Sequence, residues 1–178
     1  MKNQRTTHEF ASCGGFQRGF TLLELSVVLF IIALTVSLTL PLLGKVGDGD
    51  LHAAGRRLAG TIKYLYNEAV LEKTTYRLIF DLDHGSYRAE RQEAGGEWVK
   101  LPGRMGEKRE LPGSVEMKRI FINGRGSFTS GEVSMQIYAA GWLDEGALYL
   151  QDGKYRQTLR ISALTGTTEF YDGFRDFY

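Results

Sequence analysis

An apolar run at residues 20–43 constrains this chain more than any other feature. The run reads FTLLELSVVLFIIALTVSLTLPLL, and Glu24 is its sole charged residue. A helix rises about 1.5 Å per residue, so this run would span ~36 Å, which is enough to cross the hydrocarbon core of a bilayer. We therefore expect a transmembrane helix over residues 20–43.

The residues that precede the run predict its orientation. Residues 1–19 are polar and carry Lys2, Arg5 and Arg18 against Glu9. A positive flank favours the cytoplasmic side of a membrane, so the chain after residue 43 is expected on the opposite side. The run is longer than the ~7–15 apolar residues of a secretory signal peptide, and no small-residue cleavage site follows it. The helix is therefore expected to be kept as a single-pass anchor.

The boundary between the polar flank and the apolar run carries a specific pattern. Residues 18–24 read RGFTLLE, which resembles the prepilin-peptidase motif of type IV pilins and type II secretion pseudopilins. The resemblance implies that residues 1–19 form a cytoplasmic leader, cut off between Gly19 and Phe20. It further implies N-methylation of Phe20, a role in subunit assembly for Glu24, and a helix kink at Pro41.

Glu24 needs a partner if it enters the membrane. A carboxylate within a bilayer costs ~2.5–3.5 kcal/mol on insertion scales. A charge-assisted pair with the terminal amine of a neighbouring subunit's Phe20 would offset the desolvation of both groups. In the alternative, the chain is a plain anchored protein and Glu24 reaches the cytoplasmic interface.

Beyond the run, glycines and then a periodic pattern predict a joint and a second helical segment. Residues 44–50, GKVGDGD, contain three glycines that each disfavour a helix by ~1 kcal/mol, and we expect a glycine-rich joint there. Over residues 51–72, apolar residues recur every three or four positions, which indicates an amphipathic helix. The face expected to pack on a sheet consists of Leu51, Ala54, Leu58, Ile62, Leu65 and Ala69.

Residues 73–178 are expected to be β-rich, because short segments of β-branched and aromatic residues alternate with glycine-containing turns. We expect strands near 75–81, 86–91, 97–101, 115–122, 132–138, 147–151, 156–162 and 167–171. The predicted fold class is α+β and pilin-like, with a long amino-terminal helix packed on an antiparallel sheet in a domain covering 51–178. The helix over 57–69 and the turn at 164–166 are similar to the H-type minor pseudopilins (GspH/FimT-like).

Two segments of the β-rich half carry further predictions. Residues 170–178, FYDGFRDFY, hold five aromatic residues. Aromatic side chains bury large areas in cores and interfaces alike, and we favour packing in the core. Residues 104–110 alternate in charge and lie between two Pro-Gly pairs, which indicates a solvated loop.

Metal and catalytic chemistry find little support in the sequence. Asp81 and Asp83 flank a predicted hairpin turn. Aspartate is favoured at turn positions, so the turn alone accounts for the presence of both residues. Calcium binding there, or at Asp48 and Asp50, is the alternative, but an EF-hand-like run of ligands is absent. Cys13, the sole cysteine, lies in the expected leader. No catalytic motif is found and Asp144-Glu145 is the strongest acidic pair, so we expect no metal, no cofactor and no enzyme.

The resemblance to pilin-like proteins implies a minor pseudopilin, a structural subunit of the type II secretion pseudopilus in the bacterial inner membrane, with its domain in the periplasm. The expected partners are other pilin-like subunits, the prepilin peptidase, the inner-membrane assembly platform and the lipid bilayer. The net charge of +1 argues against nucleic acid. The alternatives are a minor type IV pilin, a membrane-tethered periplasmic binding module and, last, an anchored enzyme.

Overall fold

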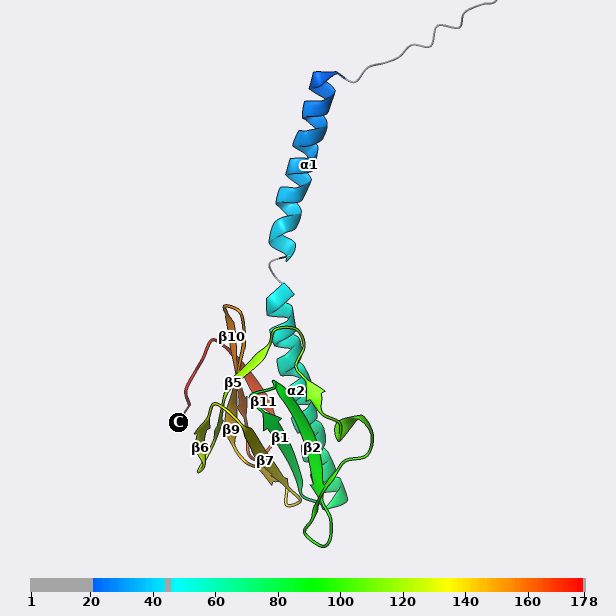
Figure 1. Cartoon of the computed structure of the whole chain (residues 1–178). Coiled ribbons are helices and arrows are strands. Elements are labelled where there is room, and N and C mark those ends of the chain that lie inside the picture. The colour runs from blue at the N-terminus through cyan, green and yellow to red at the C-terminus, as the bar shows by residue number, and fades with distance from the viewer. Residues whose placement is uncertain (1–20, 44–45, 178) are drawn as a thin grey trace, which may run out of the picture. The chain divides into compact units, whose positions relative to one another are not determined.

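The computed structural model describes residues 21–43 and 46–177, with side chains described for 21–37 and 49–177. The chain forms two compact units, Met1–Leu42 and Leu43–Tyr178. The described part of the first unit is helix α1 (Leu22–Leu43). The second unit contains helix α2 (Val46–Glu72) and two antiparallel sheets (Figure 1). The α+β class with antiparallel sheets, predicted from the sequence, is confirmed.

Helix α2 begins earlier than the sequence predicts. We expected a joint over residues 44–50, but the helix starts at Val46, so residues 46–50 are helical. Residues 44 and 45 lie outside the described part of the chain. Glycines at 47 and 49 weaken a helix by ~1 kcal/mol each. The packed turns that begin at Leu51 offset this cost, because most helix stability in proteins comes from burial of an apolar face.

The first sheet, sheet A, has the strand order β3-β2-β1-β7-β8, with the short β4 paired to β2. Its strands are antiparallel throughout, and β1 pairs with β2 on one side and with β7 on the other. The bounds are β1 (Tyr76–Asp81), β2 (Ser86–Gln92), β3 (Trp98–Lys100), β4 (Arg109–Glu110), β7 (Glu132–Tyr138) and β8 (Trp142–Leu143).

The second sheet, sheet B, has the order β11-β10-β9-β5-β6. A β-bulge between Met117 and Arg119 shifts the register of β5 against β9. A 3₁₀ helix, η1 (Gly103–Met105), lies in the connection between β3 and β4. The bounds in sheet B are β5 (Glu116–Ile122), β6 (Gly126–Phe128), β9 (Gly146–Asp152), β10 (Tyr155–Ile161) and β11 (Thr168–Asp172).

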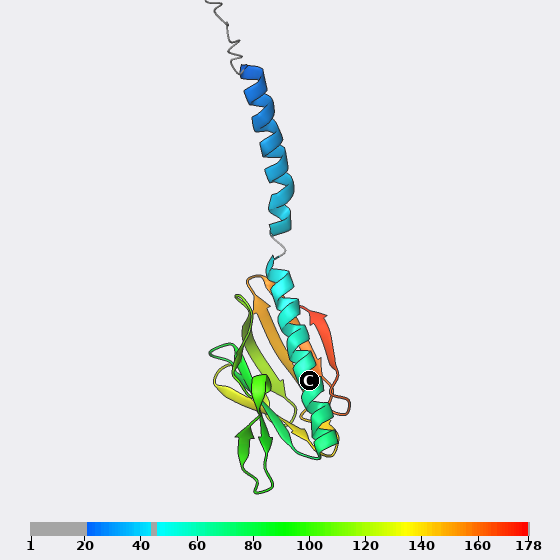
Figure 2. The same ribbon diagram turned by 90° about the vertical axis from the view of Figure 1, so that its right-hand side faces the viewer.

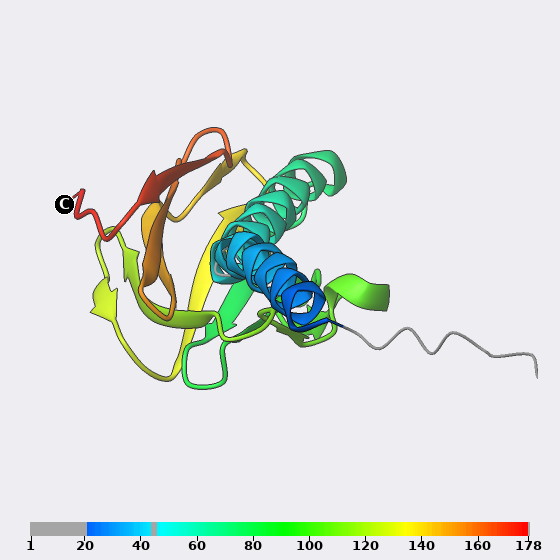
Figure 3. The same cartoon turned by 90° about the horizontal axis from the view of Figure 1, so that it is seen from above.

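The core lies where α2 meets both sheets. Figure 2 shows α2 lying across the strands, and Figure 3 shows the same helix alongside the two sheets from above. The helix contacts β10, β9, β7 and β1. The six side chains expected to face the sheet are each at most 1% exposed, and all belong to the main hydrophobic cluster: Leu51, Ala54, Leu58, Ile62, Leu65 and Ala69.

A glycine allows α2 to approach sheet B closely. An added Cβ at Gly55 would lie 2.4 Å from the side-chain oxygen of Gln157 and 3.1 Å from the ring of Phe170. Gln157 is 1% exposed, and its amide nitrogen lies 2.6 Å from Nδ1 of His52. A side chain at position 55 would therefore require the buried amide of Gln157 and the ring of Phe170 to shift.

Near its carboxyl end, α2 is tied to two loops by Tyr66. The Tyr66 hydroxyl lies 2.8 Å from the carbonyl oxygen of Gly141 and 2.6 Å from that of Leu164, and its single proton is shared between these two acceptors. Gly166 packs against the tyrosine ring, with an added Cβ falling 2.7 Å from Cγ of Tyr66. Gly166 also has a φ of 60°, which disfavours any residue with a side chain.

We expect Tyr66→Phe to lower the free energy of unfolding by about 1–3 kcal/mol, because two loop carbonyls lose their donor. The measurement is urea-induced unfolding of the chain in detergent. The control is Tyr64→Phe on the same helix, whose ring is 41% exposed and whose change is expected to stay below about 0.5 kcal/mol. Equal effects from the two variants would rule out the proposed tie.

Two segments differ from their predictions. The aromatic tail was expected in the core, but Phe170 and Phe174 are each 42% exposed, and Tyr178 lies outside the described residues. The reason is that β11 is the edge strand of sheet B, and the residues after it cross the outer face of that sheet. The charged loop over 104–110 is largely exposed, yet its end forms β4 and pairs with β2.

Candidate functional site

The first turn of α1 places the motif residues that the structure describes. The Thr21 side-chain oxygen accepts the backbone N–H of Glu24 at 3.2 Å, and the Thr21 carbonyl accepts the N–H of Leu25 at 3.1 Å. Thr21 is therefore the amino-terminal cap of the helix. Glu24 lies in the first turn, where a carboxylate interacts favourably with the helix dipole. Gly19 and Phe20 lie outside the described residues.

The side chains of α1 are exposed along its described length. The most exposed of them are Leu22 at 86%, Leu23 at 75% and Phe30 at 67%. Among the described residues, no helix combines the length and the hydropathy needed to cross a membrane. The predicted span over 20–43 includes side chains outside the described residues, among them that of Pro41, and it stays a prediction.

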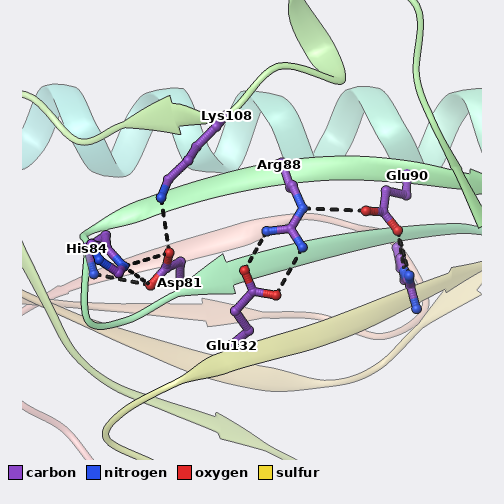
Figure 4. Close-up of polar contacts among 7 residues, drawn as sticks. Asp81, His84, Arg88, Glu90, Lys108 and Glu132 are labelled. Carbon is purple, nitrogen blue, oxygen red and sulfur yellow. Dashed lines mark hydrogen bonds and ion pairs between the residues drawn. The ribbon is translucent and has the colours of Figure 1, made fainter.

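The outer face of sheet A carries a chain of ion pairs (Figure 4). The guanidinium of Arg88 binds Glu132 on β7 through two hydrogen bonds of 2.6 and 2.9 Å, and these bonds lower the pKa of Glu132. Arg88 also contacts Glu90, which accepts a 2.9 Å bond from Nε of Arg77. Both glutamates of this row of ion pairs have an arginine partner, and the pairs fasten the three neighbouring strands β2, β1 and β7.

At the end of β1, Asp81 fastens the loop before β4 to the sheet. Its carboxylate lies 2.9 Å from Nδ1 of His84 and accepts a 3.1 Å bond from Nζ of Lys108 (Figure 4). Burial opposes ionisation of Asp81, but the hydrogen bonds from His84 and Lys108 outweigh it and hold the pKa of Asp81 at about 2. The aspartate therefore stays charged and links two segments that are far apart in the sequence.

The Asp81 link makes a prediction about pH. A carboxylate whose pKa is lower in the folded state stabilises the fold above its ordinary pKa, 3.8 here, and ceases to do so as the pH falls through the folded value. We expect Asp81→Asn to lose roughly 2 kcal/mol at pH 7, with the difference from the parent chain disappearing between about pH 4 and pH 2. Chemical unfolding at several pH values measures this.

The control for that experiment is Asp83→Asn in the same turn. Asp83 accepts the backbone N–H of Gly131 at 3.0 Å, and an asparagine oxygen can accept the same bond. Its effect should be small and independent of pH. A constant difference between Asp81→Asn and the parent from pH 7 to pH 2 would show that the charge of Asp81 does not stabilise the fold.

Four of the acids considered for metal binding or catalysis, Asp81, Asp83, Asp144 and Glu145, have structural partners. The side chain of Asp48 lies outside the described residues. Asp81 and Asp83 both hold the β1–β2 turn, through the contacts given above. Among the described residues, no group of three or more His, Cys, Asp or Glu lies close enough to hold a metal ion. Asp144 accepts the backbone N–H of Gln136 at 2.9 Å, and Glu145 pairs with Arg160 at 3.7 Å. Both acids lie in the connection between β8 and β9, and they join it to β7 and to β10.

The amino-terminal motif matches a known family. Residues 15–40 match the family described as the prokaryotic N-terminal methylation motif. The matched segment contains Gly19, Phe20 and Glu24, the residues singled out from the sequence for processing and assembly.

Two known proteins are similar to the chain, and each is called type II secretion system protein H. The protein of Pseudomonas aeruginosa is 38% identical over 86 residues, which cover 47% of this chain and 49% of that protein. The protein of Xanthomonas campestris pv. campestris is 26% identical over 126 residues, which cover 70% of this chain and 75% of that protein. The match thus spans about half the length of the first relative.

The fold is similar to a solved structure, the minor pseudopilin EPSH from the type II secretion system of Vibrio cholerae. The TM-score is 0.57, with 15% identity, and the match covers 72% of this chain and 98% of that one. At this identity the likeness concerns the fold alone. The likeness in fold agrees with the methylation motif and the two sequence relatives, and together they make the chain similar to type IV pilin-like proteins, the H-type minor pseudopilins among them.

Proposed function

We propose that this chain is a minor pseudopilin, a structural subunit of a type II secretion pseudopilus that takes part in protein export. The proposal rests on one observation: the same chain has both an N-terminal methylation motif and sequence similarity to proteins of type II secretion systems. The methylation motif covers residues 15–40, and the sequence relatives named type II secretion system protein H extend over as much as 70% of the chain. Neither feature alone separates a pseudopilin from other pilin-like proteins.

In this proposal the prepilin peptidase removes residues 1–19 and methylates Phe20. The apolar helix then holds the subunit in the inner membrane, with its domain in the periplasm. Glu24 pairs with the amine of a neighbouring subunit during assembly, and α1 packs among the helices of other pilin-like subunits. The exposed apolar side chains of α1 support this, because leaving such a surface in water is unfavourable and it requires a lipid or protein environment.

The proposed role is structural and not catalytic. The ionisable groups on the outer face of sheet A are paired with one another, as are Asp144 and Glu145 with their neighbours. A subunit that must keep its shape while it is pushed by its neighbours gains from such cross-strand pairs, because each one fastens adjacent strands.

The experiment that tests the function is deletion of the chain from the cell that encodes it. Secreted enzymes are then expected to accumulate in the periplasm, while surface pili remain. Re-expression of the intact chain should restore export. Loss of surface pili with normal export would overturn the proposal in favour of a minor type IV pilin.

A further inference from the structure

Residues 173–177 form a segment, called the strap here, that turns back over the outer face of sheet B. In Figure 1 the red segment that follows β11 runs beside that sheet, on the side away from α2. Gly173, with a φ of 79°, makes the turn, and its N–H donates to the carbonyl of Arg156 at 2.8 Å. A positive φ of this size is easily reached only by glycine. The turn at Gly173 and its main-chain hydrogen bond to β10 therefore fix the position at which the strap begins.

One buried hydroxyl holds the strap's backbone. Thr158 on β10 is fully buried, and its hydroxyl donates to the carbonyl of Gly173 at 2.8 Å. The same oxygen accepts the N–H of Arg175 at 3.1 Å. Both bonds go to main-chain atoms, so this part of the contact suits any extended peptide.

The outer face of sheet B also binds the carboxylate of Asp176 in the strap. Asp176 accepts hydrogen bonds from the guanidinium of Arg119 and from the hydroxyl of Tyr149, the second at 3.1 Å. Arg119 also lies over the ring of Tyr149, 3.9 Å from its centroid. The two donors therefore converge on one acidic group, and hydrogen bonds with an ionised partner are among the stronger ones in proteins.

Aromatic rings flank that carboxylate on both sides. Phe174 meets Tyr149 edge to face, with ring centroids 5.6 Å apart at 88°, and it lies 5.1 Å from the guanidinium carbon of Arg156. Phe177 lies 4.9 Å from the ring of Tyr171. Both geometries are favourable for aromatic pairs, and the arginine adds a cation–π contact. Residues 174–177 of the strap thus follow a four-residue pattern: an aromatic residue, any residue, an acidic residue and a second aromatic residue.

The strap covers a buried face but contributes nothing to the hydrophobic core. Beneath it, Tyr149 is 2% exposed and Thr158 is fully buried, whereas the Asp176 side chain is 71% exposed. The core residues of the described chain end at Ile161. The domain can therefore keep its core if the strap leaves, and the face below would then require another cover.

We propose that the outer face of sheet B is a peptide-docking surface, which the strap occupies in the isolated chain and which accepts a partner protein's segment of the same chemistry. That segment carries an acidic residue with an aromatic residue directly after it and another two positions before it. Arg119 and Arg156 supply the complementary charge, and Thr158 supplies the two main-chain bonds. The inference concerns the isolated domain and does not depend on the proposed role in secretion.

The test uses the chain truncated after Asp172 and a fluorescent peptide with the sequence of residues 173–178, GFRDFY. The truncated chain is expected to bind the peptide saturably, and the intact chain to bind it at least about tenfold more weakly, because the strap competes. A peptide with Asp176→Asn should also bind about tenfold more weakly to the truncated chain. Arg119→Gln in the truncated chain is the matched change on the face and should weaken binding similarly.

A second variant keeps the test independent of truncation. The full-length chain with Phe174→Ala and Asp176→Asn loses the side-chain contacts of these two strap residues and is expected to bind the wild-type peptide more tightly than the parent does. Circular dichroism confirms that each variant is folded. Folded variants that do not bind the peptide, or binding that is unchanged by Arg119→Gln, would overturn the proposal, as would equal binding by the intact and truncated chains.

Discussion

Gly19→Val is expected to leave the chain entirely as the uncut precursor when it is expressed together with a prepilin peptidase. The motif that carries this expectation lies in the segment matching the N-terminal methylation family. A peptidase that cleaves after glycine has to bring the scissile peptide close to its catalytic groups, and the missing Cβ of glycine permits that approach. A β-branched residue fills the space and stiffens the backbone. We expect the cleaved fraction to fall from nearly all to nearly none.

The measurement is the mass of the amino terminus of the membrane-extracted protein. The parent chain should begin at methylated Phe20 only when the peptidase is present. The matched control is Gly15→Val, a glycine of the same leader that lies away from the cut site, and it should be cleaved like the parent. An intact leader in the parent with peptidase would argue instead for a plain anchored domain, and a cleaved Gly19→Val chain would show that cleavage does not require the glycine.

Glu24→Ala is expected to be cleaved normally and yet to be lost from assembled filaments. Removing one partner of a buried ion pair leaves the other charge uncompensated, which typically costs about 3–5 kcal/mol. Subunit association would then weaken by about two to four orders of magnitude. Crosslinking between neighbouring subunits in membranes, with the amino-terminal mass as a check on processing, measures the effect.

Thr21→Ala separates pairing from helix capping. The side-chain oxygen of Thr21 caps the first turn of α1 by accepting the N–H of Glu24, and its removal costs about 1 kcal/mol of helix stability while the carboxylate stays in place. This variant should assemble nearly as well as the parent. If Thr21→Ala and Glu24→Ala fail alike, then the first turn of the helix, and not the charge, is what assembly requires.

The sequence predicts regular elements of the domain well, because their periodicity is local. Alternation between buried and more exposed side chains is retained in β7 and, on either side of its bulge, in β5, whereas the last four residues of β1 are all buried. Spacings of three and four residues identify the face of α2 that is buried. By contrast, β4, β6 and β8 are only two or three residues long. Segments so short carry no periodicity, and they exist because a longer neighbouring strand offers hydrogen bonds.

Contacts between distant segments could not be predicted in this way. The DxD pattern at residues 81–83 indicates a turn, but nothing local shows that Lys108 reaches Asp81 across the sheet. The aromatic residues of the strap look like core residues by composition. Their position follows from β11 being an edge strand, which is a property of the whole sheet. For the processing site, the prediction depends on the resemblance of residues 18–24 to a known motif.

The order in which the strands are used has a consequence for how the domain is made. The chain places β1 to β4 in sheet A and β5 and β6 in sheet B, then returns to each sheet with β7 and β8 and with β9 to β11. Neither sheet is complete until late in synthesis. Strand β1 cannot pair with β7, and β5 cannot pair with β9, until the later strand of each pair has been synthesised. Pairings between remote strands slow folding, because the loops between them must close first. In the proposed topology, the polypeptide would thus cross the membrane unfolded, and the domain would reach its native state only after nearly all of it had been translocated.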